Sequence, residues 1–304
     1  MHLAVVIPTI NGGETFLKML AGLRGQSLAP QTLLVIDSGS VDDTVPQALA
    51  YGAQVHKIRA SEFNHGATRE LGRHLVKADY YLFMTQDALP AHPQLLENLV
   101  KPLIKRQDIG LVYGRQLPRS VAHPLEVWNR RFNYPVTSQL KRKADRVHLG
   151  LKTVFCSNVC AVYRSSALDA VGGFPPVIMC EDQYVAARMI EAGYSIYYAA
   201  EAPVFHSHNY SMMEEFKRYF DAGVFFGSHE RWIVDHFGTP GSEGFLSFQE
   251  GRRYLISSGK PHLIPYLMLR LLIKYVGYQL GSRERFLSIS LKSRLSLHRN
   301  FWRN

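Results

Sequence analysis

Cysteine is scarce in this sequence, and its arrangement excludes several classes of protein. The 304 residues contain only Cys156, Cys160 and Cys180, and no two of them form a C-x-x-C pair. Because an odd number cannot pair completely within the chain, we expect reduced thiols in a cytosolic protein. The spacing also fits no common zinc site, so a zinc-binding module has little support.

Long hydrophobic runs are missing as well. No stretch reaches the ~18 uncharged apolar residues of a membrane-spanning helix. The nearest candidate, residues 261–281, contains Arg270 and Lys274. The opening residues MHLAVVIPTI have no basic segment before an apolar one, so we expect a buried strand there and no secretory signal.

The glycine motifs of several large enzyme classes are absent. Neither G-x-G-x-x-G nor G-x-x-x-x-G-K-[ST] occurs, which removes the main support for a dinucleotide-binding or P-loop protein. G-x-S-x-G is also missing, so a serine hydrolase of the α/β type is not expected.

The first half of the chain alternates short apolar runs with amphipathic stretches. The runs typical of buried strands are 3–8, 33–37, 53–58, 80–84 and 110–114. Between them, apolar residues recur at helical spacing in 16–23, 41–49, 65–77 and 95–103. This alternation predicts an α/β fold, a mostly parallel sheet with helices on both faces. Ligands of such sheets bind beyond the carboxyl ends of the strands.

The second half is less regular. Residues 118–150 are polar and basic with few periodic positions, and we expect a mobile segment near the site. Further elements are a strand over 154–164, a helix over 181–192, strand material over 194–206 and a helix over 211–236.

Positive charge is concentrated at the end of the chain. The net charge is +10, and the residues from Arg252 to Asn304 contain eleven Lys or Arg against one acid, Glu284. Mixed with aromatic and aliphatic residues, these cations favour contact with an anionic membrane surface. The alternatives are a solvated basic face packed on the main domain and, with no recognition module to support it, nucleic-acid binding.

Two carboxylates directly follow predicted strands. Asp37 could accept a hydrogen bond from a ribose hydroxyl or a pyrimidine base, or it could close its own turn. Asp87 follows the run YYLFM at residues 80–84. A divalent cation that faces a diphosphate usually takes one or two such carboxylates, although a capping residue before Pro90 would look the same.

A second group of candidates lies elsewhere in the chain. Glu181 and Asp182 begin a predicted helix, where the helix dipole favours acids, but either could act as a general base. His206 and His208 could bind a metal or a phosphate, or be satisfied half-buried histidines. Arg69 could neutralise a phosphate or lie on a solvated helix face.

Six stretches together resemble one enzyme family. VVIPTINGGE (5–14), VIDSGSVDDT (35–44) and GGFPPVIMCEDQYVAARMIEAGY (172–194) resemble motifs of the family 2 glycosyltransferases, which are inverting and use nucleotide sugars. FNHGATRELG (63–72), MTQDA (84–88) and FHSHNYSMMEEFKRYFDAGVFF (205–226) are similar to bacterial rhamnosyltransferases of surface polysaccharide assembly. The likeness covers roughly residues 1–210.

The resemblance implies a GT-A fold, the Rossmann-like fold of nucleotide-diphospho-sugar transferases. It also implies dTDP-L-rhamnose as donor, Mg²⁺ or Mn²⁺ as cofactor, and a lipid-linked or core oligosaccharide as acceptor in O-antigen and lipopolysaccharide biosynthesis. The enzyme would be peripheral on the cytoplasmic face of the bacterial inner membrane, and a homodimer is among its expected partners. A UDP- or GDP-sugar donor is one alternative, and a non-catalytic glycolipid-binding assembly subunit is another.

The resemblance assigns roles to individual residues. Residues expected to bind the nucleotide sugar are Pro8, Thr9, Asn11, Asp37, Asn64, His65, Arg69 and Gln86. Those expected at the metal are Asp87, His206 and His208. Asp182 is expected to be the catalytic base, and Glu181 is the less favoured choice.

One departure from the family pattern concerns the metal. The family usually has Asp-x-Asp after the metal strand, but Thr85 stands where the first acid is expected, so the ion could be weakly held or dispensable. For the chain as a whole we expect a nucleotide-sugar-binding half over 1–115, an acceptor-binding and catalytic half over 116–240, and a basic amphipathic helical extension over 241–304.

Overall fold

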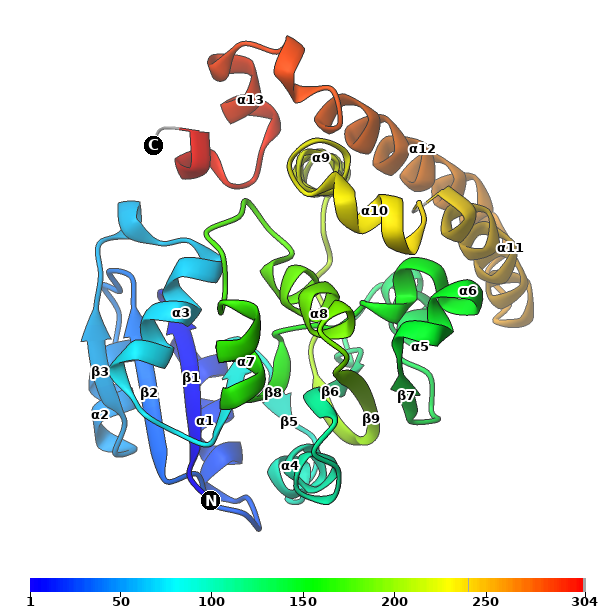
Figure 1. The fold of residues 1–304 in the computed structure, drawn as a ribbon. Helices are drawn as coiled ribbons and strands as arrows, with labels where there is room; N and C mark the ends of the chain where they lie inside the picture. The colour runs from blue at the N-terminus through cyan, green and yellow to red at the C-terminus, as the bar shows by residue number, and fades with distance from the viewer. Residues whose placement is uncertain (240, 303–304) are drawn as a thin grey trace.

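The computed structural model describes residues 1–239 and 241–302, without the side chains of 241–243. Its centre is a nine-stranded sheet in the order β3-β2-β1-β4-β8-β6-β9-β5, with β7 paired to β9 (Figure 1). The strands are β1 Leu3–Thr9, β2 Thr32–Asp37, β3 Gln54–Lys57, β4 Tyr80–Met84, β5 Leu89–Pro90, β6 Ile109–Leu117, β7 Gln139–Lys141, β8 Cys160–Arg164 and β9 Ser195–Phe205.

Helices surround this sheet and extend beyond it. They are α1 Gly13–Arg24, α2 Thr44–Ala50, α3 His65–Leu75, α4 Leu95–Lys105, α5 Pro124–Asn133, α6 Arg146–Leu149, α7 Ser165–Val171, α8 Glu181–Glu191, α9 Met212–Val224, α10 Arg231–Phe237, α11 Gly241–Ser257, α12 Ile264–Gly281 and α13 Ile289–Leu295. No described helix is both long and apolar enough to cross a bilayer. All three cysteines are free, as predicted from their number.

Both faces of the sheet are buried, as the apolar runs predict. Successive side chains of a strand point to opposite faces. Val5 and Ile7 therefore join the core with α1 and α4, whereas Ala4 and Val6 join the core with α7 and α8. The predicted α/β architecture with helices on both faces is confirmed.

Strand direction explains where the polar residues gather. Six of the nine strands, β1, β2, β3, β4, β6 and β9, run in the same direction, and β5, β7 and β8 run the opposite way. The carboxyl ends of β4, β6 and β9 and the beginning of β8 therefore lie at the same edge. Open α/β sheets bind their ligands at such an edge.

The segment 118–150, which we expect from its few periodic positions to be mobile, contains regular structure. It contains α5, β7 and α6. Helix α5 begins with Pro124 behind the capping side chain of His123, and it buries Leu125 and Trp128 against α11 and α12. Proline suits the first turn of a helix because its missing N–H would have no partner there.

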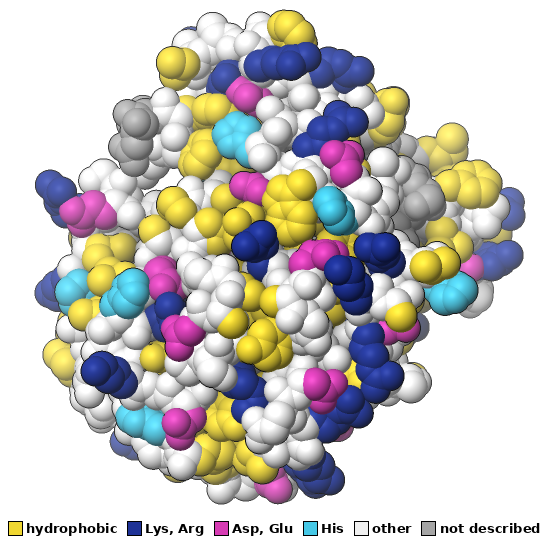
Figure 2. Space-filling view, viewed as in Figure 1, with side chains coloured by type: hydrophobic (Ala, Val, Ile, Leu, Met, Phe, Trp, Pro, Cys, Tyr) yellow, Lys and Arg dark blue, Asp and Glu magenta, His cyan; other side chains and the backbone are white. Residues whose placement is uncertain are grey.

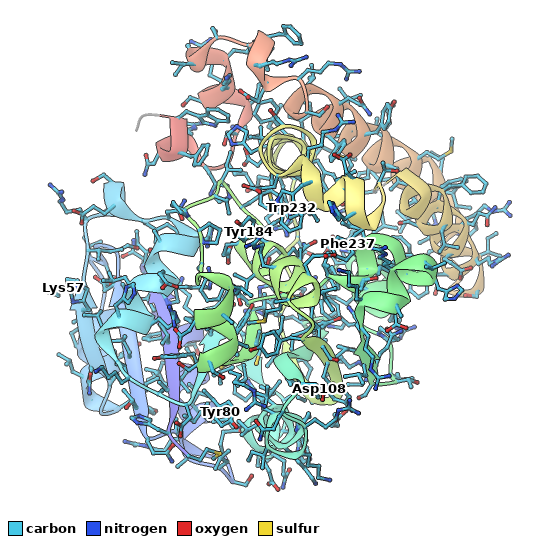
Figure 3. The ribbon with its side chains drawn as sticks, viewed as in Figure 1. Lys57, Tyr80, Asp108, Tyr184, Trp232 and Phe237 are labelled. Carbon is cyan, nitrogen blue, oxygen red and sulfur yellow. The ribbon has the colours of Figure 1, made fainter. Side chains whose placement is uncertain are left out.

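Two other predicted elements are shorter than expected. The strand predicted over 154–164 begins only at Cys160, and the residues before it form a loop at the site. The helix predicted over 211–236 is interrupted after Val224 by a π-helical turn, Phe225–His229, before α10. The ring of Tyr184 on α8 meets that of Trp232 on α10 edge to face, with centroids 6.0 Å apart (Figure 3).

The C-terminal helices pack on α9 through glycines. A Cβ atom on Gly281 of α12 would lie 1.9 Å from the carbonyl oxygen of Phe220, so only glycine permits this approach. After α13 the chain returns to the first half, where the Asn300 side-chain amide donates to the carbonyl oxygen of Ala60. Two positions named above lie outside the described residues. They are Arg303, which belongs to the basic tail, and residue 240, which ends the predicted catalytic half.

Candidate active site

One aspartate and two histidines meet at the sheet edge where β4 and β9 end. Oδ2 of Asp87 lies 3.6 Å from Nε2 of His206 and 3.5 Å from Nε2 of His208, and the two Nε2 atoms are 3.0 Å apart. Asp87 follows β4 after two residues, and His206 follows β9 directly. The three predicted metal ligands are therefore brought together by the ends of two distant strands.

His206 is held in a defined orientation. It is buried, and its Nδ1 atom lies 3.0 Å from Oε1 of Gln116 on β6. The amide nitrogen of Gln116 donates to Tyr134 and Ser157, which fixes its oxygen as the group that faces the imidazole. His206 therefore donates from Nδ1 and presents the lone pair of Nε2 to Asp87. Metal-binding histidines are usually oriented in this way by a second residue.

The geometry of these ligands fits a divalent transition metal. Two atoms bound at right angles, each about 2.1 Å from a metal, are about 3.0 Å apart, which matches the two Nε2 atoms. All three ligand atoms lie within 4.8 Å of one another. Burial lowers the pKa of His206 to about 3, and it also lowers the pKa of His208. Both imidazoles are thus neutral near pH 7, the form that binds metals.

Three arginines add positive charge around this site. Nη2 of Arg119 lies 2.6 Å from the carbonyl oxygen and 3.5 Å from Oδ2 of Asp87, and Nε of Arg130 donates to the carbonyl oxygen of His206. After burial, which has the largest effect, the charges of Arg130, Arg218 and Arg119 contribute to the lowered pKa of His208. Such a field suits a multiply charged anion.

Arg218 differs from the other two arginines because it has few partners. Its Nη1 lies 3.4 Å from the hydroxyl oxygen of Tyr210, and the guanidinium lies 5.6 Å from the centre of that ring. Among the described residues, no carboxylate lies within ion-pairing distance of it. Its charge is therefore available to a ligand.

Asp182 has the properties of a base that works near neutral pH. It lies in the first turn of α8 and is partly exposed. Its Oδ2 accepts from the backbone N–H of Asn158 over 3.1 Å. Burial of the carboxyl, followed by the charge of Glu181, raises the pKa of Asp182 to about 7. A pKa near the working pH is optimal for general base catalysis.

Glu181, the alternative base, is committed to another role. Its Oε1 accepts from Nη1 of Arg69 over 2.8 Å and from the side-chain amide of Asn158 over 3.0 Å. Burial acts to raise its pKa, but Arg69 and His65 outweigh that effect and hold the pKa below its usual value. Glu181 is thus an ionised partner in a buried pair.

Arg69, which the family resemblance implies near the nucleotide or its phosphates, takes part in a buried ion pair. Arg69 is 3% exposed, so it lies neither on a solvated helix face nor in an open site. Its Nη1 donates to Glu181 and to the carbonyl oxygen of His65. Separating Arg69 from Glu181 would leave both buried charges without a counter-ion, which costs stability.

The loop before β8 connects Asp182 to the cluster of Asp87, His206 and His208. Ser157 accepts from Gln116, which orients His206, and the next residue, Asn158, donates its backbone N–H to Asp182. The Asn158 side chain is itself held by the hydroxyl of Tyr163. Two consecutive residues therefore support the two halves of the site.

Asp37 lies at the sheet edge, and its carboxylate already accepts hydrogen bonds from neighbouring residues. It is 1% exposed, and its carboxylate accepts from the backbone N–H groups of Gly39 and Ser40 and from the Ser40 hydroxyl. The hydroxyl of Thr9 lies 3.4 Å from it. The Asx turn that the sequence left open as an alternative is the interaction the structure records.

The other residues predicted to bind nucleotide near β1 hold its loop together. The side-chain amide of Gln86 makes two hydrogen bonds with the backbone of Ile10, while Asn11, in the left-handed conformation with φ 46°, accepts from Val41. Pro8 lies in β1 and is only partly buried. Gln86 therefore shapes this edge through its contacts within the chain.

Asn64 and His65 are placed together at the start of α3. Asn64 caps the helix by accepting from two backbone N–H groups, and its amide donates to the carbonyl oxygen of Val177. His65 lies between the rings of Phe63 and His298, and burial lowers its pKa to about 4. Both residues connect the first half of the chain to segments that follow it.

Comparison with known proteins places the chain in a family. Residues 4–172 match the model of the family described as Glycosyl transferase family 2. The chain belongs to the family 2 glycosyltransferases. This result confirms the family resemblance predicted from the strand and turn motifs.

Two relatives of this family 2 glycosyltransferase are similar over nearly their whole length. The O-antigen chain rhamnosyltransferase RfbN of Salmonella typhimurium is 42% identical, over 100% of this chain and 97% of its own. The O-antigen chain rhamnosyltransferase WbaN of Salmonella anatum is 40% identical, over 99% of this chain and 95% of its own.

Solved structures confirm the predicted GT-A fold of this glycosyltransferase. The mannosyltransferase PcManGT from Pyrobaculum calidifontis, solved with GDP-Man and Mn²⁺, aligns with a TM-score of 0.59 and 13% identity over 91% of this chain and 87% of its own. Glucosyl-3-phosphoglycerate synthase from Mycobacterium tuberculosis, solved with Mn²⁺ and UDP-glucose, aligns with a TM-score of 0.54 and 18% identity. The alignment covers 79% of this chain and 80% of that one. At these identities the likeness concerns the fold alone.

Proposed function

We propose that this protein transfers L-rhamnose from dTDP-L-rhamnose, with inversion, to a hydroxyl of a lipid-linked or core oligosaccharide during O-antigen synthesis. The main observation is a site with an Asp/His/His cluster, three nearby arginines and a carboxylate with a pKa of about 7. The two rhamnosyltransferase relatives support the choice of sugar.

The reaction is a single in-line displacement. Asp182 takes the proton of the acceptor hydroxyl while that oxygen forms a bond to the anomeric carbon. The bond between this carbon and the diphosphate oxygen breaks, the electron pair leaves with the nucleoside diphosphate, and the anomeric configuration inverts. Arg119, Arg130 and Arg218 offset the charge that develops on the leaving group.

Asp87, His206 and His208 would hold a divalent cation beside the donor diphosphate. Such a cation neutralises phosphate oxygens. Imidazole is a better ligand for transition metals than for Mg²⁺, which prefers oxygen. Two histidines beside one carboxylate therefore favour Mn²⁺ over Mg²⁺, and they supply the ligands that a second aspartate would provide elsewhere in the family.

The C-terminal helices are proposed to bind the cytoplasmic surface of the inner membrane. Helix α12 leaves Met268, Leu269 and Leu272 exposed on one side. Exposed cations lie on both sides of this helix in the sequence: Arg252, Arg253, Lys260, Arg283 and Arg285. Glu284, the one acid among residues 252–302, is buried. Figure 2 shows Lys and Arg side chains over the C-terminal segments. Apolar side chains flanked by cations match an anionic bilayer.

Thermal unfolding with dTDP, UDP or GDP, each with Mn²⁺ or Mg²⁺, tests the donor and the metal. A ligand that binds only the folded state raises the midpoint, by the equivalent of ~2.7 kcal/mol at 100 times its Kd. We expect the largest shift with dTDP and Mn²⁺, and its loss in Asp87→Ala. A larger shift with UDP or GDP would disprove the donor, and no shift with any nucleotide would favour a non-catalytic subunit.

Asp182→Asn tests the base in the same preparations. We expect transfer to fall about 10²–10⁴-fold while nucleotide binding remains. Asp235→Asn, which changes an exposed carboxylate on α10, serves as the matched control. Near-normal transfer by Asp182→Asn would show that another group accepts the proton.

Arg218→Gln tests the third arginine. Because Arg218 has no carboxylate partner among the described residues, its loss leaves no buried acid without a counter-ion. We therefore expect kcat to fall about 10²–10³-fold at unchanged unfolding temperature, as when one transition-state donor is removed elsewhere. Arg231→Gln, on the exposed side of α10, is the control.

A further inference from the structure

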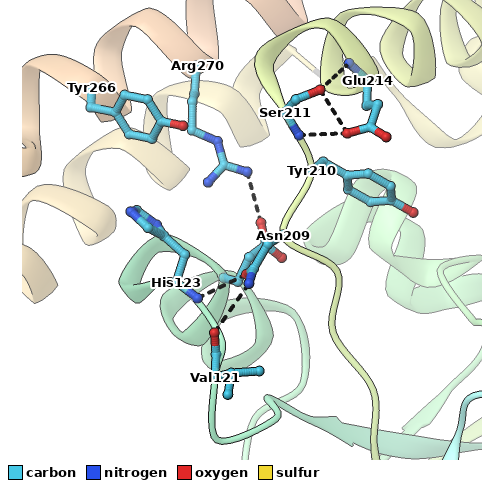
Figure 4. Close-up of a pocket in the computed structure, with 9 residues that line it drawn as sticks. Val121, His123, Asn209, Tyr210, Ser211, Glu214, Tyr266 and Arg270 are labelled. Carbon is cyan, nitrogen blue, oxygen red and sulfur yellow. Dashed lines mark hydrogen bonds and ion pairs between the residues drawn. The ribbon is translucent and has the colours of Figure 1, made fainter. Parts of the chain in front are cut away.

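A cavity lies next to the cluster of Asp87, His206 and His208. It has a volume of about 420 Å³, within the range of sites for small ligands. It lies between the beginning of α5, the segment that leads into α9, and the first half of α12 (Figure 4). The lining residues are Val121, His123, Glu126, Asn209, Tyr210, Ser211, Glu214, Tyr266 and Arg270.

Two chain segments run directly from the metal site into this cavity. Asn209 and Tyr210 follow His208, whose ring lies 5.2 Å from that of Tyr210. On the other side, Val121 comes two residues after Arg119, which contacts Asp87. Asn209 joins the two segments, since its side chain donates to the carbonyl oxygen of Val121 and accepts from the backbone N–H of His123.

The walls of the cavity combine aromatic rings with hydrogen-bonding groups. The rings of His123 and Tyr266 form one wall, with centroids 5.7 Å apart. Tyr266 is 37% exposed, so its ring is open to a ligand. Glu214 and Asn209 supply oxygen and nitrogen atoms on the opposite side (Figure 4). Apolar faces with a few convergent polar groups are typical of small-molecule sites.

The charges that line the cavity do not favour a phosphate. Among the described residues that line the cavity, Arg270 is the only Lys or Arg, and it is 5% exposed and paired with Glu126 and Glu215. Glu214 adds a negative charge at the rim. Arg119, Arg130 and Arg218 instead contribute positive charge near His208, where the donor diphosphate is proposed to bind. A neutral polyhydroxyl ligand fits the cavity better.

The buried cluster around Arg270 also holds the cavity in shape. Glu126 belongs to α5, Glu215 to α9 and Arg270 to α12, so one guanidinium connects all three walls. Charged hydrogen bonds of this kind impose strict geometry when both partners are buried. The cavity is thus built from positions far apart in the sequence, and α12 lies beyond residues 4–172 that match the family model.

We infer that this cavity binds the terminal sugar of the acceptor glycan, with the ring of Tyr266 stacked against a face of that sugar. The inference rests on the proposed transferase function and adds the position of the acceptor. Because α12 carries both Tyr266 and the exposed side chains proposed to meet the membrane, a lipid-linked acceptor can place its glycan in the cavity and its lipid in the bilayer.

The experiment uses water-soluble farnesyl-diphosphate esters of galactose, glucose and N-acetylglucosamine as acceptors. For Tyr266→Ala we expect the acceptor KM to rise about tenfold, while dTDP binding and hydrolysis of the donor without acceptor remain as in the unchanged protein. Tyr266→Phe keeps the ring and should restore the KM. Phe286→Ala removes a 73% exposed aromatic ring that does not line the cavity, and it should leave the KM unchanged.

A binding measurement separates this inference from the proposed function. Saturation-transfer NMR with the same farnesyl esters should detect contact with the sugar ring in the unchanged protein and lose it in Tyr266→Ala. If no donor supports transfer but this contact is present, the cavity assignment stands and the transferase function falls. An unchanged KM in Tyr266→Ala, or no sugar contact in the unchanged protein, would overturn the acceptor site.

Discussion

Nδ1 of His206 lies 3.0 Å from Oε1 of Gln116, although the two residues are 90 positions apart in the sequence. An amide oxygen can only accept, so the imidazole must donate from Nδ1 and keep Nε2 free of a proton. That lone pair faces Asp87 and His208. The tautomer needed for metal binding is therefore set by a residue on β6, outside the cluster itself.

Gln116→Met should weaken metal binding, since it removes the acceptor that fixes this tautomer. Changes in such supporting residues typically cost about 10–100-fold in metal affinity. Gln116→Glu keeps an acceptor for Nδ1 and should retain most of the affinity. Titration of each variant with Mn²⁺, followed by electron paramagnetic resonance, gives the two values. Equal affinities for Gln116→Met and the unchanged protein would rule out this role.

The sequence indicates that Asp87, His206 and His208 could lie together, but it does not indicate the residue that orients them. Asp87 and His206 each follow a run of apolar residues, and the common direction of those strands implies that they meet. Gln116 is one more residue at the end of a strand, and nothing local distinguishes it from its neighbours. Its role depends on the pairing of β6 with β9, which requires tertiary structure.

The partners of Arg69 and Arg218 could not be predicted from the sequence. The family resemblance implies that Arg69 lies near the nucleotide or its phosphates, and in the structure it is buried and paired with Glu181. Arg218 lies on a helix that the sequence predicts, yet no local feature of the sequence shows that its charge acts on His208. Burial and partner choice are tertiary properties, which a pattern in one segment does not contain.

The transfer rate should depend on pH through Asp182. A base is active when it has lost its proton, so a pKa of about 7 means that activity is present above this pH and lost below it. We expect kcat/KM to fall about tenfold per pH unit on the acid side. Glu181→Gln removes the neighbouring negative charge and should move this limb to lower pH. A rate that is constant between pH 5.5 and 8 would contradict the assignment.

Arg69→Met should destabilise the fold strongly. The substitution leaves Glu181 charged and buried without its counter-ion, which typically costs about 3–5 kcal/mol. The double variant Arg69→Met/Glu181→Leu should recover part of this loss. Arg59→Met removes an exposed ion pair with Glu62 and should leave the urea midpoint nearly unchanged, because exposed ion pairs contribute little to stability. Urea unfolding compares the variants, and similar midpoints for Arg69→Met and Arg59→Met would disprove the buried-pair argument.

Leu272→Glu should reduce binding to anionic vesicles. Leu272 is 57% exposed on α12, so a charge there leaves the fold intact but opposes insertion of this side into a bilayer. Leu49→Glu is a matched control, because Leu49 on α2 is also 57% exposed and lies far along the chain from the basic helices.

Flotation with phosphatidylcholine vesicles, with and without phosphatidylglycerol, measures the binding. We expect salt-sensitive binding that requires the anionic lipid. Equal effects of the two substitutions, or self-association of the protein in place of vesicle binding, would mean that α12 contacts something other than a membrane.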